Sequence, residues 1–254
     1  MRSSPSSRSD TPSSPAWLTA SPYAHRGLHG PGRLENSRAA FEAAIAAGFG
    51  IELDVQMSRD GRAIVIHDAS LGRLTEAEGR VVDKDWSDLR RIRLENSEET
   101  VPDLEEVLTL IGGRCALLIE VKAPRGKTSA LCRDIEDRLR RYSGQAAIMS
   151  FNPEVGRWFA INAPHIVRGL VVTEKDKGRI RGRIERHLSL WRSGTDFLAY
   201  DIRDLPSPFA AATRARGLPL VTWTISNRRD EEAASAYADQ MIHELPQKAA
   251  PTGR

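Results

Sequence analysis

Short apolar runs alternate with longer amphipathic segments along most of the chain. Runs typical of strands occur at 23–24, 51–55, 63–66, 116–121, 146–151, 167–172, 197–202, 218–225 and 240–243. Between most of them, apolar residues recur every three or four positions, at 36–47, 102–111, 129–142, 153–161, 180–191, 208–216 and 229–237. The short apolar runs predict strands, and the recurrence every three or four residues predicts helices. Strands that alternate with helices indicate βαβ units and a parallel sheet.

About eight strands in a chain of 254 residues favour a closed (β/α)8 TIM barrel over an open doubly wound sheet. The sequence contains neither GxGxxG nor GxxxxGK(S/T), which removes the usual dinucleotide-binding and P-loop interpretations. The alternation fails between residues 69 and 100, where the chain is polar and rich in Arg, Asp and Glu. We therefore expect a single barrel domain over residues 16–254, with a small insertion after the second strand at about 69–100.

Composition narrows the class of protein further. The chain is 40% hydrophobic and 28% charged, as globular proteins are, and its net charge is +3 with a pI near 9.0. Such a small excess of basic over acidic residues suits an anionic small-molecule substrate and gives no reason to expect binding to nucleic acid. Residues 1–15 lack an apolar segment, which predicts a disordered tail rather than a signal peptide.

The same composition bears on location. No window approaches the roughly 18 apolar residues of a membrane span, so no stable membrane anchor is expected. The two cysteines, Cys115 and Cys132, show no CxxC spacing and favour a reducing compartment. Together these features predict a cytoplasmic protein. They give no indication of its oligomeric state.

Ionisable side chains gather where the predicted strands end, which is the active face of a parallel barrel. They are His25, Arg26, Glu52, Asp54, His67, Glu120 and Lys122. Carboxylates two residues apart on a strand point to one side, and three of them in one pocket need a cation. Ligands that are all oxygen atoms suit Mg²⁺ or Ca²⁺. Histidines suit proton transfer at neutral pH, and the cationic side chains of Arg26 and Lys122 suit a phosphate. The set predicts phosphodiester cleavage.

Longer segments around these residues resemble the glycerophosphodiester phosphodiesterase family. They are Ala24-His25-Arg26-Gly27, Glu35-Asn36-Ser37 followed by Ala40-Phe41, Ile51-Glu52-Leu53-Asp54-Val55, Asp60-Gly61, His67-Asp68, Glu120-Val121-Lys122, Ser150-Phe151-Asn152-Pro153 and Trp223-Thr224-Ile225. They occur in the family's order between about residues 22 and 245. The family is a TIM-barrel phosphodiesterase with an insertion after the second strand, which matches the interruption at 69–100.

The resemblance implies a role for each candidate. His25 and His67 are expected to form the acid–base pair. Glu52, Asp54 and Glu120 are expected to bind one divalent cation, Mg²⁺ or Ca²⁺. Arg26 and Lys122 are expected to contact the phosphate, and Trp223 the alcohol part of the substrate.

Some positions have a second interpretation or depart from the family pattern. Packing inside the barrel explains Trp223 equally well. Asn36 has two interpretations, the N-cap of the first helix and a catalytic residue, and the first has at least as much support. Ser37 stands where the family more often has Thr. The last strand reads Ile242-His243-Glu244-Leu245-Pro246 where the family has Ile-Thr-Asp-x-Pro.

The expected function is metal-dependent hydrolysis of a small-molecule glycerophosphodiester to an alcohol and glycerol 3-phosphate. Two alternatives remain open: a lysophospholipase D-type hydrolase on the same scaffold, and a non-catalytic phosphodiester-binding module. The mostly charged insertion favours a water-soluble substrate, and a complete acid–base–metal set argues against a binding module. A barrel amidohydrolase would need a His-x-His motif that this sequence lacks.

Overall fold

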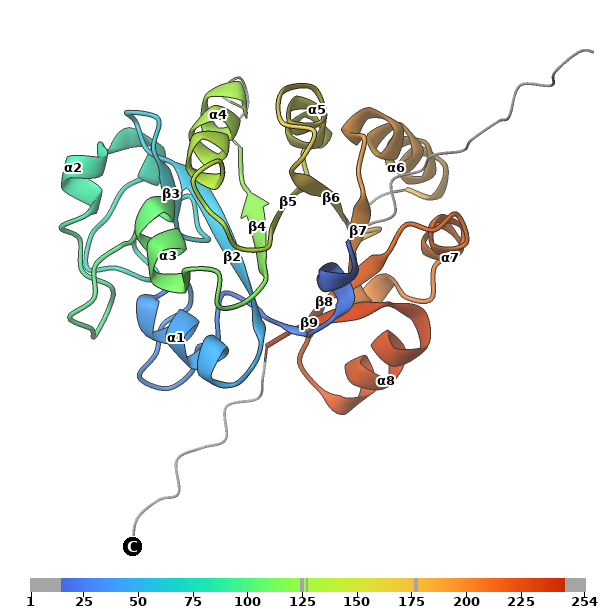
Figure 1. The fold of residues 1–254 in the computed structure, drawn as a ribbon, viewed down its shortest axis with the longest axis horizontal. Helices are drawn as coiled ribbons and strands as arrows, with labels where there is room; N and C mark the ends of the chain where they lie inside the picture. The colour runs from blue at the N-terminus through green and yellow to red at the C-terminus, as the bar shows by residue number, and fades with distance from the viewer. Residues whose placement is uncertain (1–14, 124–125, 127, 176–177, 245–254) are drawn as a thin grey trace, which may run out of the picture.

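The computed structural model describes residues 15–123, 126, 128–175 and 178–244. Within these ranges, eight parallel strands form a ring in which β1 pairs with both β2 and β9 (Figure 1). In ring order they are β1 (Tyr23–Ala24), β2 (Gly50–Met57), β4 (Leu117–Val121), β5 (Ala146–Ser150), β6 (Val167–Val172), β7 (Phe197–Asp201), β8 (Leu220–Ile225) and β9 (Gln240–His243). The prediction of a closed TIM barrel is confirmed.

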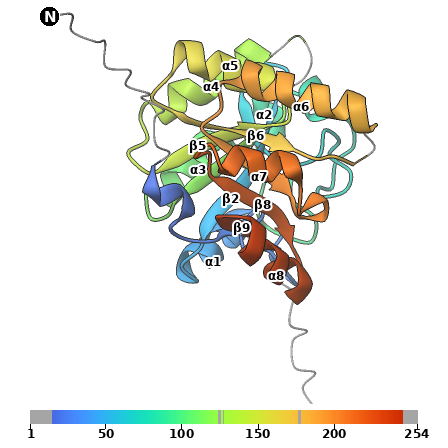
Figure 2. The same cartoon turned by 90° about the vertical axis from the view of Figure 1, so that its right-hand side faces the viewer.

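Helices cover the outside of the ring (Figures 1 and 2). They are α1 (Arg38–Ala46), α3 (Leu104–Ile111), α4 (Thr128–Leu139), α5 (Pro153–Asn162), α6 (Arg179–Ser193), α7 (Pro208–Arg214) and α8 (Arg228–Tyr237). Polar caps set several of their starts, because free backbone N–H groups in the first turn need acceptors. The side chain of Asp103 accepts from Glu106 at the start of α3, and that of Asn227 accepts from Asp230 at the start of α8.

Alternate side chains of the strands fill the barrel. Leu118, Met149 and Val221 belong to the buried interior cluster, whereas their sequence neighbours pack outward against the helices. At Gly169 a Cβ atom would lie only 2.3 Å from the Phe197 ring, so this glycine makes room for the aromatic side chain. The 3-10 helix Ala16–Thr19 adds the buried Leu18 to the same cluster at the end where the strands begin. The opposite end, where the strands finish, is left for polar groups.

The insertion is a lobe beside the barrel, at the left of Figure 1. It starts with β3 (Ala63–Val65), antiparallel to β2, and includes the 3-10 helix Val81–Asp83 and the short α2 (Trp86–Leu89). Its apolar residues form a separate small core, made of Ile64, Ile66, Leu71, Leu74, Val81, Leu89, Leu94 and Val101. The sequence shows no regular period here because these residues lie on several very short elements and on the loops between them. The tail predicted at 1–15 lies outside the described residues, apart from Pro15.

Candidate active site

Three carboxylates meet at the end of the barrel where the strands finish. Glu52 and Asp54 lie on β2 and are almost fully buried, and Glu120 on β4 is paired in register with Asp54. One oxygen atom from each lies within 4.8 Å of the other two. The two-residue spacing in the sequence therefore does place these side chains on one face, as predicted.

Two cations accompany the carboxylates. Nζ of Lys122 lies 3.1 Å from Oδ1 of Asp54 and 2.7 Å from Oε1 of Glu120. Nε of Arg26 lies 3.2 Å from Oδ2 of Asp54, and the backbone N–H of Arg26 donates to Oε2 of Glu52 over 3.0 Å. When all three acids are ionised, their negative charges outnumber the two positive charges, which favours the binding of a further cation.

The two buried acids of β2 respond in opposite directions to this environment. Burial raises the pKa of Glu52 well above its usual range, and the negative charges of Asp54 and Glu120 raise it further. Burial also opposes ionisation of Asp54, but Lys122 and Arg26 outweigh it and lower its pKa. Glu52 is thus the acid that gains most from an added cation, and Asp54 is the one the protein already neutralises.

Asn36 holds Asp54 in position. Its Nδ2 donates to Oδ2 of Asp54 over 3.0 Å, and its Oδ1 accepts from the backbone N–H of Asp54 over 3.3 Å. The residue is buried and has a φ of 56°, the left-handed region that asparagine tolerates better than most residues. The prediction that Asn36 caps the first helix is wrong. Ser37 is the N-cap of α1, and its side chain accepts from Ala40.

A chain of ion pairs links the insertion to the barrel. Glu35 accepts from Nη1 of Arg26 over 2.7 Å and from Nη2 of Arg73 over 2.7 Å. Arg73, in the insertion, also pairs with Asp68, whose Oδ1 lies 2.6 Å from Nδ1 of His67. Burial opposes ionisation of Glu35, but these arginines lower its pKa to about 2. Arg26 and His67 are therefore held by one network.

The two candidate proton-transfer residues have similar surroundings. Nδ1 of His67 faces Asp68, and Nδ1 of His25 lies 3.5 Å from Oε2 of Glu244, directly after β9. Nε2 of His29 lies 3.9 Å from the other oxygen of Glu244. A carboxylate beside Nδ1 favours the tautomer that leaves Nε2 for proton exchange. His67 is also close enough to Asp54 to lower the pKa of that acid.

Trp223 lies on β8 at the edge of the interior cluster. Its indole N–H donates to the carbonyl of Ala199 over 3.0 Å, and its ring meets the exposed ring of Phe151 edge to face at 5.7 Å. Trp223 thus packs against the interior cluster and is half-buried. Phe151 adds an apolar edge to the rim of the site.

Several groups at the site were not singled out from the sequence: His29 and Arg73 carried no motif, and Glu244 was noted only as a departure from one. Asn36 and Glu35 belonged to a recognised segment, but their partners lie far away in the chain.

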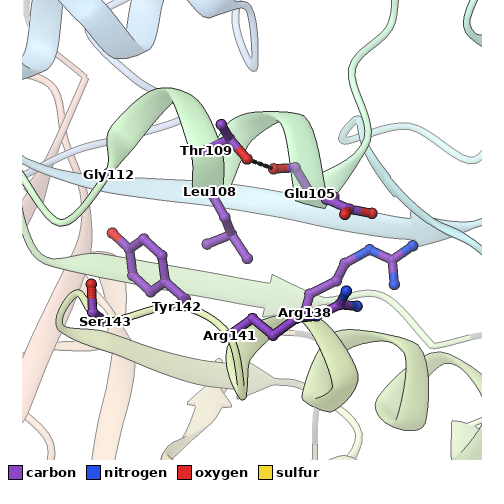
Figure 3. A pocket seen from close by; sticks show the side chains of 8 residues that line it. All are labelled: Glu105, Leu108, Thr109, Gly112, Arg138, Arg141, Tyr142 and Ser143. Carbon is purple, nitrogen blue, oxygen red and sulfur yellow. Dashed lines mark hydrogen bonds between the residues drawn. The ribbon is translucent and has the colours of Figure 1, made fainter.

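A separate hollow lies between α3 and α4, lined by Glu105, Leu108, Thr109, Gly112, Arg138, Arg141, Tyr142 and Ser143 (Figure 3). None of the candidate residues lines it.

The carboxylates fit a divalent cation. All three donors are oxygen atoms, they converge from two adjacent strands, and the pKa of Glu52 is raised by burial and by the negative charges of Asp54 and Glu120. Such a donor set suits a hard cation. No helix in the described part of the chain is long and apolar enough to cross a membrane.

Residues 25–246 match the model of the glycerophosphoryl diester phosphodiesterase family. The chain belongs to this family. A glycerophosphodiester phosphodiesterase from Caldanaerobacter subterraneus subsp. tengcongensis is 30% identical over 229 residues, which cover 84% of this chain and 89% of that protein. One from Bacillus altitudinis is 44% identical over 107 residues, which cover 39% of this chain and only 43% of that protein.

Solved structures of family members share the barrel. A phosphodiesterase from Oleispira antarctica, in complex with the product sn-glycerol-3-phosphate, superposes with a TM-score of 0.77 at 23% identity and covers 89% of this chain and 93% of its own. The glycerophosphodiester phosphodiesterase from Thermotoga maritima superposes with a TM-score of 0.70 at 22% identity, covering 87% of this chain and 92% of its own.

Proposed function

We propose that this protein is a metal-dependent phosphodiesterase that hydrolyses glycerophosphodiesters to an alcohol and glycerol 3-phosphate. The observation that carries the proposal is the convergence of Glu52, Asp54 and Glu120 with Arg26 and Lys122 at the carboxyl end of the strands. Family membership supports it, and so does the glycerol 3-phosphate held by the Oleispira antarctica relative.

In this proposal Glu52, Asp54 and Glu120 hold Mg²⁺ or Ca²⁺. When bound, the cation supplies Lewis-acid polarisation of the phosphoryl group. Arg26 and Lys122 offset the negative charge that develops on the phosphate oxygens. Burial lowers the pKa of Lys122, but Glu120 and Asp54 outweigh burial and raise it, so the side chain stays cationic at neutral pH.

His25 and His67 carry the protons. One accepts the proton of the attacking hydroxyl, which is either water or the glycerol 2-hydroxyl of the substrate, and the other donates a proton to the departing alcohol. Attack by the 2-hydroxyl leaves a cyclic phosphate, and a water molecule then opens that ring in a second step to give glycerol 3-phosphate. Glu244 and Asp68 occupy the Nδ1 sides of the two rings, which leaves each Nε2 for this transfer. A carboxylate oxygen lies 2.6 Å from Nδ1 of His67 and 3.5 Å from Nδ1 of His25, so each ring has an acid on the same side, and we assign the acid and base roles to the pair together.

Trp223 and Phe151 form the aromatic edge of the site, where we propose that the alcohol part of the substrate packs. The described part of the barrel makes up one catalytic domain in this proposal. The protein acts in the cytoplasm, where Cys115 and Cys132 stay reduced; both are free thiols in the structure.

The test is product release from a panel of glycerophosphodiesters and one lysophospholipid, with and without chelator, followed by an enzymatic assay for glycerol 3-phosphate. Metal-dependent release of glycerol 3-phosphate from the water-soluble diesters supports the proposal. Preference for the lysophospholipid would favour the lysophospholipase D-type alternative. Binding without turnover of any substrate would favour a binding module.

A further inference from the structure

Four large apolar side chains point away from the protein along α6. Ile180, Ile184, Leu188 and Trp191 are 79%, 56%, 59% and 79% exposed. Among the described residues, only three other large apolar side chains are exposed, and they are spread over other elements. Surface helices of globular proteins normally turn their apolar stripe toward the core. An apolar stripe that faces solvent therefore indicates an interaction surface.

The opposite side of the same helix already packs against the barrel. Gly182 and Ser193 are buried, and Leu190 packs against the apolar cluster between the strands and α7. The exposed residues follow one another at intervals of four, four and three, which keeps them within about 80° of the helix circumference at 100° per residue. The outward stripe is thus a continuous second face, on the outside of the molecule (Figures 1 and 2).

Basic residues border the stripe on both sides. By the same helical spacing, Arg181 and Arg192 follow one edge, and Arg183 and His187 follow the other. All four are exposed, and Glu185 is the only acid in the helix. An apolar stripe with basic borders and a tryptophan is typical of helices that lie in the interface of an anionic membrane.

The surface beside the stripe is hollowed. Ile180, Ile184 and Leu188 line the hollow together with Arg183 and His187. Apolar walls below basic groups match the chemistry of an anionic lipid, whose acyl chain is apolar and whose phosphate is negative. Arg192 is held by Glu154 on α5, which fixes one basic border against the body of the protein.

A second copy of the chain fits this surface less well. Two copies related by a two-fold axis would bring the basic borders of one α6 against the basic borders of the other. Like charges at such short range repel. Glu154 on α5 offsets Arg192 alone, and Glu185 is the only acid on α6 itself. Charge complementarity therefore favours an anionic partner.

We propose that α6 docks the protein reversibly on anionic lipid surfaces. Ile180, Ile184, Leu188 and Trp191 enter the boundary between head groups and acyl chains, and the bordering arginines contact lipid phosphates. Such docking needs no membrane-spanning helix. It is independent of the proposed phosphodiesterase activity, because none of the α6 residues belongs to the catalytic cluster.

Vesicle flotation tests the proposal, with vesicles of equal parts phosphatidylglycerol and phosphatidylcholine and with pure phosphatidylcholine. We expect the full chain to float with the anionic vesicles only and to detach as salt is raised. Ile184→Glu should reduce binding at least about ten-fold, since it places a charge in the apolar boundary. Arg181→Gln and Arg183→Gln should each reduce binding about five-fold, as expected for about 1 kcal/mol per basic residue.

Matched changes on α8 serve as controls. Tyr237→Ala removes an exposed aromatic residue and Arg228→Gln an exposed arginine, and both should leave binding unchanged. Hydrolysis of a soluble diester should be the same in every variant, so a failure of docking is distinguishable from a failure of the active site. Failure of the wild type to bind anionic vesicles, or equal binding by Ile184→Glu, would overturn the proposal. So would light scattering that shows a dimer lost in Ile184→Glu without vesicle binding.

Discussion

Replacement of Glu52 by glutamine should stabilise the metal-free protein. The glutamic acid side chain is 1% exposed, and its pKa is raised because burial and two neighbouring carboxylates disfavour its charge. Oxygen atoms within 4.8 Å of each other imply a repulsion of about 3 kcal/mol per pair of charges at an effective dielectric constant of about 20. Glutamine has nearly the same shape, still accepts from the backbone of Arg26, and carries no charge.

The sign of the pH dependence follows from the raised pKa. In the unfolded chain Glu52 loses its proton near pH 4.5, whereas the folded protein retains it to a higher pH. The wild type therefore loses stability relative to Glu52→Gln as the pH rises above about 4.5, by at most about 3 kcal/mol at pH 7. With the partial relief from Arg26, we expect a gain of about 1–3 kcal/mol, or about 3–10 °C in Tm.

Urea unfolding of chelator-treated protein, followed by tryptophan fluorescence between pH 4.5 and 7.5, measures this difference. Asp54→Asn is the matched control, because the pKa of Asp54 is lowered and its charge neutralises Lys122 and Arg26. That variant should be less stable than the wild type. Added Mg²⁺ or Ca²⁺ should stabilise the wild type more than Glu52→Gln. A metal-free Glu52→Gln variant no more stable than the wild type at pH 7, or an Asp54→Asn variant that is more stable, would refute the reasoning.

Three further outcomes are expected. Exhaustive chelation abolishes hydrolysis, and Mg²⁺ or Ca²⁺ restores it better than Zn²⁺, because the donor set is entirely carboxylate; full activity in excess chelator would contradict this. His25→Ala and His67→Ala each lower kcat by about 10²–10⁴ while calorimetry shows metal affinity retained, and an aryl phosphodiester rescues only the variant that lacks the general acid. Equal rescue of both variants would exclude a one-acid, one-base mechanism. Glu35→Gln removes up to about 3 kcal/mol of stability at neutral pH, since the lowered pKa of about 2 stabilises the fold above pH 4.5 and that contribution disappears as the pH falls toward 2; thermal melts that show the same loss at pH 2 and pH 7 would be inconsistent with it.

Local spacing carried most of what the sequence could predict about this fold. Glu52 and Asp54 had to share a side because the side chains of a strand alternate with a period of two. The parallel barrel followed from the repeated alternation of strand and helix, and its carboxyl end then collected Glu120 and Lys122. These inferences need only neighbours in the chain and one rule of topology.

Asn36 shows where such reasoning stops. Asn36 and Ser37 are both good N-caps, so the sequence offers two equivalent starts for the helix. The choice is made by a hydrogen bond to Asp54, 18 residues away, which draws the asparagine into the site and leaves Ser37 to cap. Arg73 likewise reaches Glu35 only because the insertion folds back onto the segment that precedes α1. Such contacts depend on tertiary structure, which no local spacing encodes.

Closure of the ring has a consequence for how the enzyme becomes active during its synthesis. The backbone N–H of His25, next to β1, donates to the carbonyl of His243 on β9, and the imidazole of His25 faces Glu244. β1 is synthesised first, but His25 next to it gains Glu244 as a neighbour only after β9 has been synthesised and paired with β1. A nascent chain that has made every strand but β9 already contains the three clustered carboxylates and both His25 and His67, yet the surroundings of His25 are unfinished. In such a chain, catalytic turnover would require the closed ring, whereas metal binding would require only the part of the ring that contains β2 and β4.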